Sequence, residues 1–94
     1  MPGEWPGVVR HFAAASFWQC YDALPQAQQR AADKSFALLR SNPKHPSLQF
    51  KKTGVLWSVR VGLAYRALAT EEADGYSWFW IGTHAEYDRL LRQS

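Results

Sequence analysis

Four side chains in the second half of the sequence carry chemistry suited to an anionic substrate: Lys51, Arg60, Arg66 and His84. Guanidinium and ammonium groups stabilise negative charge, and an imidazole can act as a general base or a general acid. Together they could support phosphodiester cleavage without a metal ion, with the arginines stabilising charge that develops at phosphorus. RNA is the natural substrate for such chemistry, because its own 2′-hydroxyl group can serve as the nucleophile.

Two further residues accompany this set. Tyr87 lies three residues after His84, within reach of the same helix face, but it also forms an apolar stripe with Leu90 and Leu91 that favours core packing. Lys52 lies beside a turn, where it could contact RNA or only keep the turn soluble. The candidate catalytic residues are therefore Arg60, Arg66, His84 and Tyr87, and the candidate RNA-binding residues are Lys51 and Lys52.

Each candidate also has a purely structural interpretation. Arginines on an exposed sheet face are usually solvated, and a single histidine at a helix start is often a surface residue. The sequence contains no metal-ligand spacing, phosphate-binding glycine loop or nucleophile elbow, so neither a metal nor a cofactor is predicted. His11 and His45 have no partner pattern and receive no role.

A β-hairpin would position the two arginines. Residues 57–61 alternate between apolar and polar side chains, as a half-buried strand does. A three-residue loop over 62–64 would pair Arg60 with Arg66 on one face, whereas a two-residue loop would split them and bury one unpaired. The longer loop is therefore predicted, and two adjacent like charges indicate an anion between them. The opposite face would carry Trp57, Val59, Val61, Tyr65, Ala67 and Ala69.

The beginning of the chain predicts a strand and a short helix. Residues 1–7 contain two prolines and two glycines and indicate a loose arm, and residues 8–13 could form a first strand. Ser16-x-x-Gln19 is a capping-box pattern that would open a helix. That helix would stop before Pro25, because the residue preceding a proline avoids the α region.

A second helix is expected from Pro25 to Asn42. Proline suits the first turn of a helix, and asparagine can adopt a left-handed conformation at the C-terminal end. One apolar face of this helix would pack on the sheet. It consists of Leu24, Ala27, Ala31, Ser35 and Leu38, with Ala32, Phe36 and Leu39 beside them.

The remaining segments predict strands and a final helix. Residues 47–52 alternate as a strand that turns at Thr53-Gly54, and the acidic residues 70–75 indicate a loop. Residues 77–81 are apolar on both faces, which predicts a strand inside the sheet. Thr83-x-x-Glu86 is a second capping box, with Thr83 as N-cap and His84 at the first helical position.

Composition is consistent with one small globular domain spanning residues 1–94. The chain is 47% hydrophobic and 15% aromatic, with a formal net charge of +3, which favours an acidic or nucleic-acid partner without deciding between them. The single Cys20 excludes an internal disulfide. No leader pattern or membrane-length apolar run is visible, so a cytoplasmic protein without membrane contact is expected. The order of elements predicts an α+β fold with two N-terminal helices on a mainly antiparallel sheet.

At these residues the sequence resembles the RelE/ParE superfamily of type II toxin–antitoxin toxins. The resemblance covers nearly the whole chain. It rests on Leu-Pro followed by an alanine-rich helix, then N-P-K-H-P-S-L-Q-F-K-K, W-S-V-R-V-G-L-A-Y-R-A-L and W-I-G-T-H-A-E-Y-D-R-L-L. It implies a small α+β fold with two helices packed on a curved sheet, and an antitoxin that wraps the toxin and covers its basic face.

The resemblance also implies alternative activities. RelE-like members cut mRNA in the ribosomal A site without a metal, using lysines, arginines and a terminal His or Tyr. Carried over, these are Lys51, Lys52, Arg60, Arg66, His84 and Tyr87. ParE-like members instead poison DNA gyrase and lack this cluster. Some RelE-like nucleases carry a glutamate base, yet no acidic residue occurs from Ser41 to Thr70, so the base would be His84 or a lysine.

Three functions therefore remain open. The leading hypothesis is a ribosome-dependent mRNA endonuclease that arrests translation. The second is a non-enzymatic gyrase inhibitor, and the third is a non-toxic antitoxin-binding partner in an autoregulatory complex. The short first helix slightly favours the nuclease over a gyrase poison.

Overall fold

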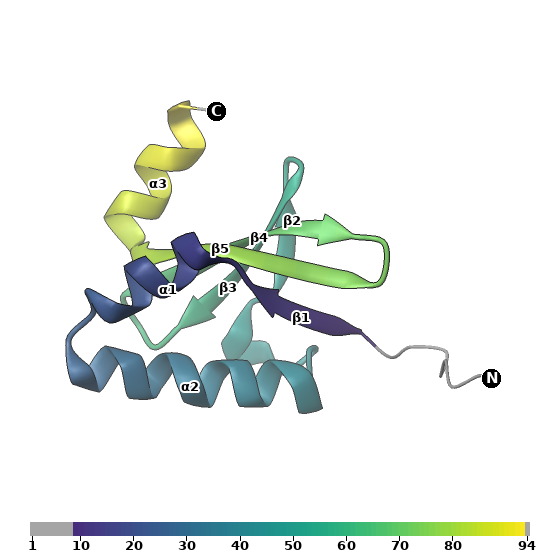
Figure 1. Cartoon of the computed structure of the whole chain (residues 1–94), viewed down its shortest axis with the longest axis horizontal. Coiled ribbons are helices and arrows are strands. Elements are labelled where there is room, and N and C mark those ends of the chain that lie inside the picture. The colour runs from purple at the N-terminus through teal and green to yellow at the C-terminus, as the bar shows by residue number, and fades with distance from the viewer. Residues whose placement is uncertain (1–8, 94) are drawn as a thin grey trace.

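The computed structural model describes residues 9–93, which form a five-stranded sheet with α-helices on both sides (Figure 1). The elements are β1 (Arg10–Ala13), α1 (Ala15–Asp22), α2 (Gln26–Ser41), a 3₁₀ turn η1 (Pro46–Leu48), β2 (Lys51–Thr53), β3 (Leu56–Val61), β4 (Tyr65–Glu72), β5 (Gly75–Thr83) and α3 (His84–Gln93). The strand order is β1-β5-β4-β3-β2. Only β1 pairs in parallel, with β5, and the other pairs are antiparallel. The predicted α+β class and helix order are confirmed.

The β3–β4 hairpin has the predicted register. Val61 pairs with Tyr65 and Arg60 pairs with Arg66, across the three-residue loop 62–64. Gly62 in this loop has φ 61°, a left-handed conformation that glycine adopts without steric cost. The two arginines therefore lie on the same face of the sheet.

The other face of the sheet is covered by α1 and α2, and it is called the helix-covered face below (Figure 1). Its strands contribute side chains of alternating positions, as expected for a sheet with one buried side. Helix residues fill the space above them and complete the core. The buried core consists of Phe17, Ala32, Leu39, Leu48, Val59, Val61, Ala67, Ala69, Trp78 and Ile81.

A β-bulge in β5 changes the direction of its tryptophans. Leu68 pairs with Trp80 and Ala69 pairs with Trp78, so Phe79 is an extra residue on β5. A bulge of this kind shifts the alternation of side chains by one position. Trp78 therefore points into the helix-covered core, whereas Trp80 lies on the opposite face.

The predicted capping box at Ser16 and Gln19 is wrong. Helix α1 begins two residues earlier than this pattern predicts, its N-cap is Ala14, and no side chain caps it. The Ser16 hydroxyl donates instead to the carbonyl oxygen of Phe79, at 2.8 Å. This hydrogen bond links the first turn of α1 to the bulge in β5.

The segment after α2 also differs from the prediction. Asn42 has φ −151°, and Gln49 is the non-glycine residue that is left-handed, with φ 44°. Residues 46–48 form the 3₁₀ turn η1 instead of a strand, with proline at its start and the His45 side chain accepting a hydrogen bond from the Ser47 N–H. This capped turn uses residues that a strand would need, so β2 starts only at Lys51.

The acidic segment 70–75 is mostly strand. β4 continues to Glu72, and only residues 73 and 74 form the turn into β5. Glu71 fits the strand because its carboxylate accepts a hydrogen bond from Trp57 Nε1 at 2.9 Å. Residues 77–81 lie within β5, between β1 and β4, as predicted. The proposed arm over residues 1–7 lies outside the described residues.

None of the helices within residues 9–93 is long and apolar enough to cross a membrane.

Candidate active site

The face opposite α1 and α2 carries both hairpin arginines and is called the arginine face. It comprises Ser58, Arg60, Arg66, Leu68, Trp80 and Gly82, and α3 covers part of it through Tyr87. Helix α3 projects from the end of β5, away from α1 and α2 (Figure 1). Ser58, Leu68 and Tyr87 are buried here, outside the main core.

Arg66 is the central cation of the arginine face. Its Nη2 group donates to Gln49 Oε1 at 3.0 Å, and its guanidinium carbon lies 5.6 Å from the centre of the Tyr87 ring. Its Nε and Nη1 atoms are buried and have no hydrogen-bond partner among the described residues. Leaving buried donors of a charged group unpaired is unfavourable. An anion with several oxygens, such as a phosphate, would satisfy them with short, charge-assisted bonds.

Tyr87 supports this guanidinium from α3. The residue is only 6% exposed, and its hydroxyl donates to Oγ of the fully buried Ser58 at 3.4 Å. A cation near an aromatic ring is attracted by the negative ring face. The phenol hydroxyl is thus directed into the sheet, and the ring holds Arg66.

Gln49 is a site residue that the sequence interpretation missed. The strand expected over residues 47–52 gave it no role, yet its side-chain oxygen accepts a hydrogen bond from Arg66. Its left-handed backbone is uncommon for a residue with a side chain, and such conformations often occur at functional sites. No periodicity or motif in the sequence marks Gln49. The position of its side-chain amide depends on the geometry of the turn before β2.

The start of α3 is ordered as predicted from the second capping box. Glu86 Oε1 accepts from the Thr83 N–H at 2.9 Å, and the Glu86 N–H donates to Thr83 Oγ1 at 3.2 Å. The hydrogen bonds from the backbone and hydroxyl of Thr83 lower the pKa of Glu86 below its ordinary value. The cap therefore keeps the first turn of α3 at a fixed place beside the arginine face.

His84 is held at the beginning of α3. Its backbone N–H donates to the Ala64 carbonyl in the hairpin loop at 2.8 Å. Its Nδ1 lies 3.2 Å from Asp88 Oδ2, and its ring centre lies 5.7 Å from that of Tyr87. If Nδ1–H donates to Asp88, Nε2 of the neutral ring is left to accept a proton. His84 and Arg66 are thus both neighbours of Tyr87.

The other three candidates are distributed differently. Lys51 is exposed on β2, paired with Ser58 and therefore on the arginine face. Arg60 lies opposite Arg66, but its Nε donates to the Gly62 carbonyl at 3.0 Å. Lys52 belongs to the other face, where its Nζ lies 4.0 Å from Glu71. The structure therefore brings Arg66, His84, Tyr87 and Lys51 to one face and separates Lys52 from them.

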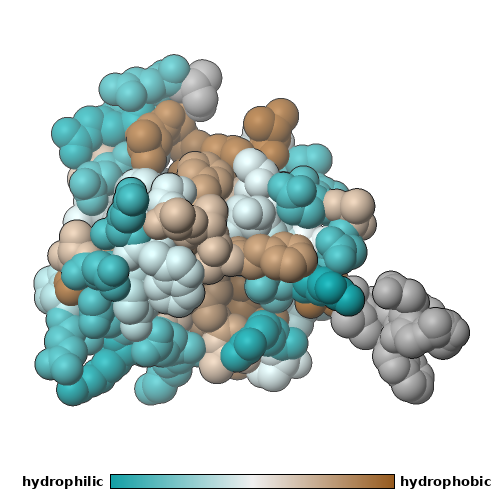
Figure 2. Space-filling model, viewed as in Figure 1, coloured by the Kyte–Doolittle hydropathy of each residue, from teal (hydrophilic) through white to brown (hydrophobic). Residues whose placement is uncertain are grey.

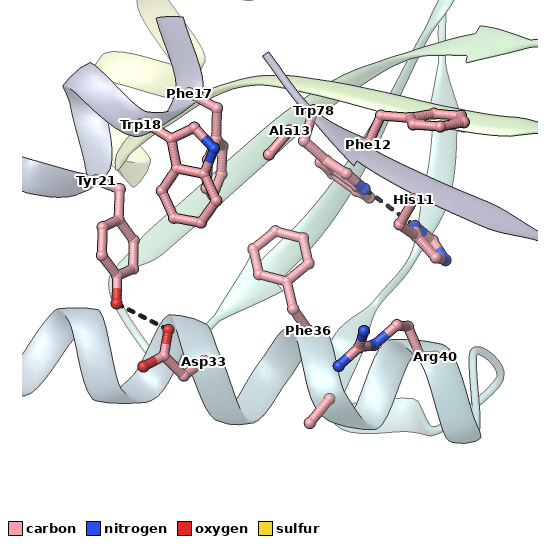
Figure 3. A pocket seen from close by; sticks show the side chains of 11 residues that line it. His11, Phe12, Ala13, Phe17, Trp18, Tyr21, Asp33, Phe36, Arg40 and Trp78 are labelled. Atoms are coloured by element: carbon pink, nitrogen blue, oxygen red, sulfur yellow. Dashed lines mark hydrogen bonds between the residues drawn. The ribbon is translucent and has the colours of Figure 1, made fainter. Parts of the chain in front are cut away.

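A pocket of about 390 Å³ lies on the other side of the sheet, between β1, α1 and α2 (Figure 3). Its walls are mainly aromatic, and four of its polar side chains form two hydrogen-bonded pairs. The Tyr21 hydroxyl donates to Asp33 at 2.8 Å, and Trp78 Nε1 donates to His11 Nδ1 at 3.1 Å. None of the candidate residues lines this pocket.

The surface of the protein carries both hydrophilic and apolar side chains. In the space-filling view, hydrophilic residues border a central band of apolar side chains (Figure 2). Several large apolar side chains are exposed, among them Phe12 and Trp18 beside the aromatic pocket. Within residues 9–93, no group of three or more His, Cys, Asp or Glu side chains is arranged to hold a metal ion.

Comparisons with known proteins give the same picture of the fold. A chain of the RelB–RelE antitoxin–toxin complex from Methanococcus jannaschii is similar at a TM-score of 0.65 and 13% identity, covering 84% of this chain and 96% of that one. The archaeal RelE–RelB complex from Pyrococcus horikoshii matches at a TM-score of 0.59 and 19% identity, covering 81% and 94%. The isolated E. coli RelE toxin matches at a TM-score of 0.59 and 8% identity, covering 92% and 99%. At identities this low, the structural similarity establishes a shared fold and no more.

The family assignment rests on the sequence itself. No curated protein matches the sequence. The family description of the ParE-like toxin domain, however, matches residues 26–89, from the start of α2 into α3. This stretch includes the hairpin, Arg66, His84 and Tyr87, and it is more than half of the chain. The chain therefore belongs to the ParE-like toxin family, within the RelE/ParE superfamily of toxin–antitoxin toxins.

Proposed function

We propose that this protein is a toxin that cleaves mRNA on the ribosome, in the cytoplasm, without a metal ion. The observation that carries the proposal is Arg66, whose buried Nε and Nη1 have no partner among the described residues. A phosphate of RNA would accept hydrogen bonds from both donors. The ribosomal setting is proposed from the resemblance of the sequence to RelE-like toxins, whose fold this chain shares.

The proposed reaction is an attack of the RNA 2′-oxygen on the adjacent phosphorus. The new O2′–P bond forms as the P–O5′ bond breaks, which leaves a cyclic phosphate and a free 5′-hydroxyl group. One proton must leave the 2′-hydroxyl and another must reach the departing 5′-oxygen. His84, held by Asp88, and Lys51, on the same face, are the groups proposed for these two transfers.

Arg66 would stabilise the extra negative charge of the five-coordinate phosphorus. Donors that are already in place when the charge develops need no reorganisation, and a single one typically contributes on the order of 10² to 10³ in rate. Tyr87 is proposed as a positioning residue because its hydroxyl is bonded to Ser58 and its ring lies beside Arg66. Arg60 would add positive charge from the neighbouring strand.

The proposal includes a cognate antitoxin as partner. Two of the similar structures are complexes of RelE with the antitoxin RelB. An acidic antitoxin segment lying on the arginine face would satisfy Arg66 in place of RNA and so silence the toxin. Co-purification with the product of the adjacent gene tests this part directly.

The test of activity is primer extension on mRNA from cells that express the chain alone. Discrete in-frame cuts in translated messages are expected, and Arg66→Ala should lower cleavage by about 10² to 10³. Arg92→Ala is the matched control, because it removes the same charge from the exposed end of α3. Full cleavage by Arg66→Ala would refute the assignment.

A stability measurement separates a functional role from a structural one. Replacing a buried charge with an apolar side chain of similar volume is often neutral or stabilising. Arg66→Met should therefore leave the free energy of unfolding unchanged or raise it, while cleavage is lost. A large loss of stability would instead mark Arg66 as a structural residue.

The second candidate function is inhibition of DNA gyrase. It is favoured by the family match, which is to ParE-like toxins. Growth arrest with a DNA-damage response and intact mRNA would support it. Harmless expression would support the third possibility, a non-toxic antitoxin-binding partner.

A further inference from the structure

A second hollow, of about 900 Å³, lies on the helix-covered side, where α2 ends and no longer shields the sheet. The end of α2, the segment before β2, and strands β1, β3 and β5 form its walls. It is distinct from the aromatic pocket of Figure 3, although His11 and Arg40 line both. Its polar and aromatic lining includes His11, Arg40, Lys44, His45, Gln49, Phe50, Trp57 and Tyr76.

Both histidines of this hollow are fixed as hydrogen-bond donors. The Ser47 N–H donates to His45 Nδ1 at 3.2 Å, and Trp78 Nε1–H donates to His11 Nδ1 at 3.1 Å. A ring nitrogen that accepts a hydrogen bond is unprotonated, so the proton of each neutral ring is on Nε2. Each ring can therefore offer an Nε2–H to an acceptor.

Two cations add to these donors. Neither Arg40 nor Lys44 forms an ion pair with another residue in the range 9–93. Arg40 lies near His11 (Figure 3), and burial together with this guanidinium lowers the pKa of His11. Among residues 9–93, no carboxylate lines the hollow, and the nearby Glu71 contacts Trp57 and Lys52. The hollow thus selects a ligand rich in acceptor oxygens.

The aromatic wall indicates what else the ligand contains. The rings of Phe50, Trp57 and Tyr76 pack together with centres 4.9 to 5.2 Å apart, and His11 stacks on Tyr76 at 5.6 Å. Half-buried rings beside cations are the combination that binds single-stranded nucleic acids, since bases stack on rings while phosphates contact the charges.

Gln49 connects this hollow to the arginine face. Gln49 lines the hollow, and its side-chain oxygen accepts a hydrogen bond from Arg66 Nη2. We propose that the hollow binds one nucleotide of the RNA strand. The base of this nucleotide would stack against the aromatic rings, and its own phosphate would lie at Arg40 and Lys44. The next phosphate along the strand would lie at Arg66. This inference rests on the proposed function and adds a second RNA contact, on the helix-covered side of the sheet.

An acidic peptide is the rival occupant, because carboxylates also accept hydrogen bonds. The nucleotide is favoured by the aromatic wall and by the direct link through Gln49 to the Arg66 site. The two ligands make different predictions for binding, which can be measured without any cleavage.

The test uses the full chain carrying Arg66→Met, so that RNA is bound and not cut. Fluorescence anisotropy with a short single-stranded RNA is compared for Arg40→Ala/Lys44→Ala and for Arg30→Ala/Lys34→Ala. Both pairs remove two positive charges, and in the control pair both charges are on the exposed surface of α2. The first pair should flatten the dependence of log K on log salt by about 0.7 for each lost phosphate contact, and the control should not.

Removal of a ring gives an independent measurement. Tyr76→Leu should weaken RNA binding by about 5- to 150-fold if a base stacks there, with thermal unfolding checked in parallel. Equal binding by the Arg40→Ala/Lys44→Ala pair and its control would overturn the inference. Binding of a glutamate-rich peptide without any binding of RNA would also overturn the inference, in favour of a protein partner.

Failure of the inference and failure of the proposed function are distinguishable. If the hollow is not used, the Arg40→Ala/Lys44→Ala variant binds RNA like the control pair, while the chain with Arg66 intact still cuts mRNA. If the protein does not cleave RNA at all, primer extension shows no cuts whatever the binding result. Adenosine monophosphate serves as the single-nucleotide probe, and its binding without binding of the RNA strand would contradict the proposed continuous path.

Discussion

The two faces of the sheet differ in how fully helices cover them and in how completely their polar groups are paired. On the helix-covered face, α1 and α2 bury an apolar core, and the neighbouring pocket contains the hydrogen-bonded pairs Tyr21–Asp33 and Trp78–His11. On the arginine face, one helix gives partial cover through Tyr87, and two buried N–H donors of Arg66 have no partner among the described residues. The first face meets the usual rules of a stable interior, and the second departs from them at one residue.

This difference shows how a small domain can hold an unsatisfied charge. Large apolar burial on the helix-covered face supplies stability that the arginine face lacks. If the arginine face is the proposed active site, its unpaired donors favour function at the expense of stability. Mutations on the two faces should accordingly separate stability from activity.

The largest expected effect is on the helix-covered face. Trp78→Ala should lower the free energy of unfolding by about 3–5 kcal/mol, because it removes a fully packed ring from the core. Trp80→Ala, two residues away but on the half-buried arginine face, should cause a clearly smaller loss. Chemical denaturation measures both, and equal losses would mean that the bulge does not separate the two rings.

The second effect concerns the thin cover of the arginine face. A Cβ atom at Gly82 would lie 2.4 Å from Trp80 Cζ2 and 2.8 Å from Glu86 Oε1. Gly82→Ala should therefore destabilise the protein by about 1–3 kcal/mol through overpacking. Trp80→Leu in the same chain should recover part of that loss by making room. A neutral Gly82→Ala in thermal unfolding would show that α3 moves away freely.

A third, smaller effect compares the two capping patterns. Thr83→Ala should cost about 1 kcal/mol, because Thr83 bonds Glu86 in a complete capping box. Ser16→Ala should cost less, since Ser16 does not cap α1 and its hydroxyl donates to an exposed carbonyl, that of Phe79. Urea denaturation of both variants tests the order, and a larger loss for Ser16→Ala would reverse it.

The smallest effect is a pH dependence. Burial and Arg40 lower the pKa of His11 below its ordinary value of 6.5. The unfolded chain therefore binds more protons as pH falls through 6.5, so the free energy of unfolding should decrease there. His11→Gln cannot be protonated but keeps an acceptor for Trp78, and should remove this slope.

Glu86 gives a second, separate acid window. Its pKa is lowered by the bonds from Thr83, so the stability it contributes is present above its ordinary value of 4.5 and is lost as pH falls below it. Unfolding midpoints measured from pH 7.5 to 3.5 should show both steps. Persistence of the upper step in His11→Gln would assign it to another group.

Much of the arginine face was predictable because its determinants are local. The register that pairs Arg60 with Arg66 follows from alternation and the cost of burying one arginine alone. The cap at Thr83 follows from a spacing of three residues, since both partners lie in one turn. Pro25 likewise marks the start of α2, although it is the N-cap and the helix begins at Gln26, one residue later than predicted.

Other features could not be predicted from such patterns. The Ser16 spacing was a capping pattern, but a bulged carbonyl at Phe79, distant in sequence, takes its hydroxyl. The role of Gln49 depends on a 3₁₀ turn that places its amide on Arg66. Neither partner is close in the chain, so no local signal could identify them.

The sequence by itself determined the α+β class, the hairpin register and the cap of the last helix, because these depend on contacts between near neighbours. Tertiary structure alone decided that Trp78 and Trp80 point to opposite faces and that Gln49 joins Arg66 to the second hollow. The physical reason is that a bulge, a capped turn and a buried charge are settled by which distant groups satisfy each other once the chain has packed.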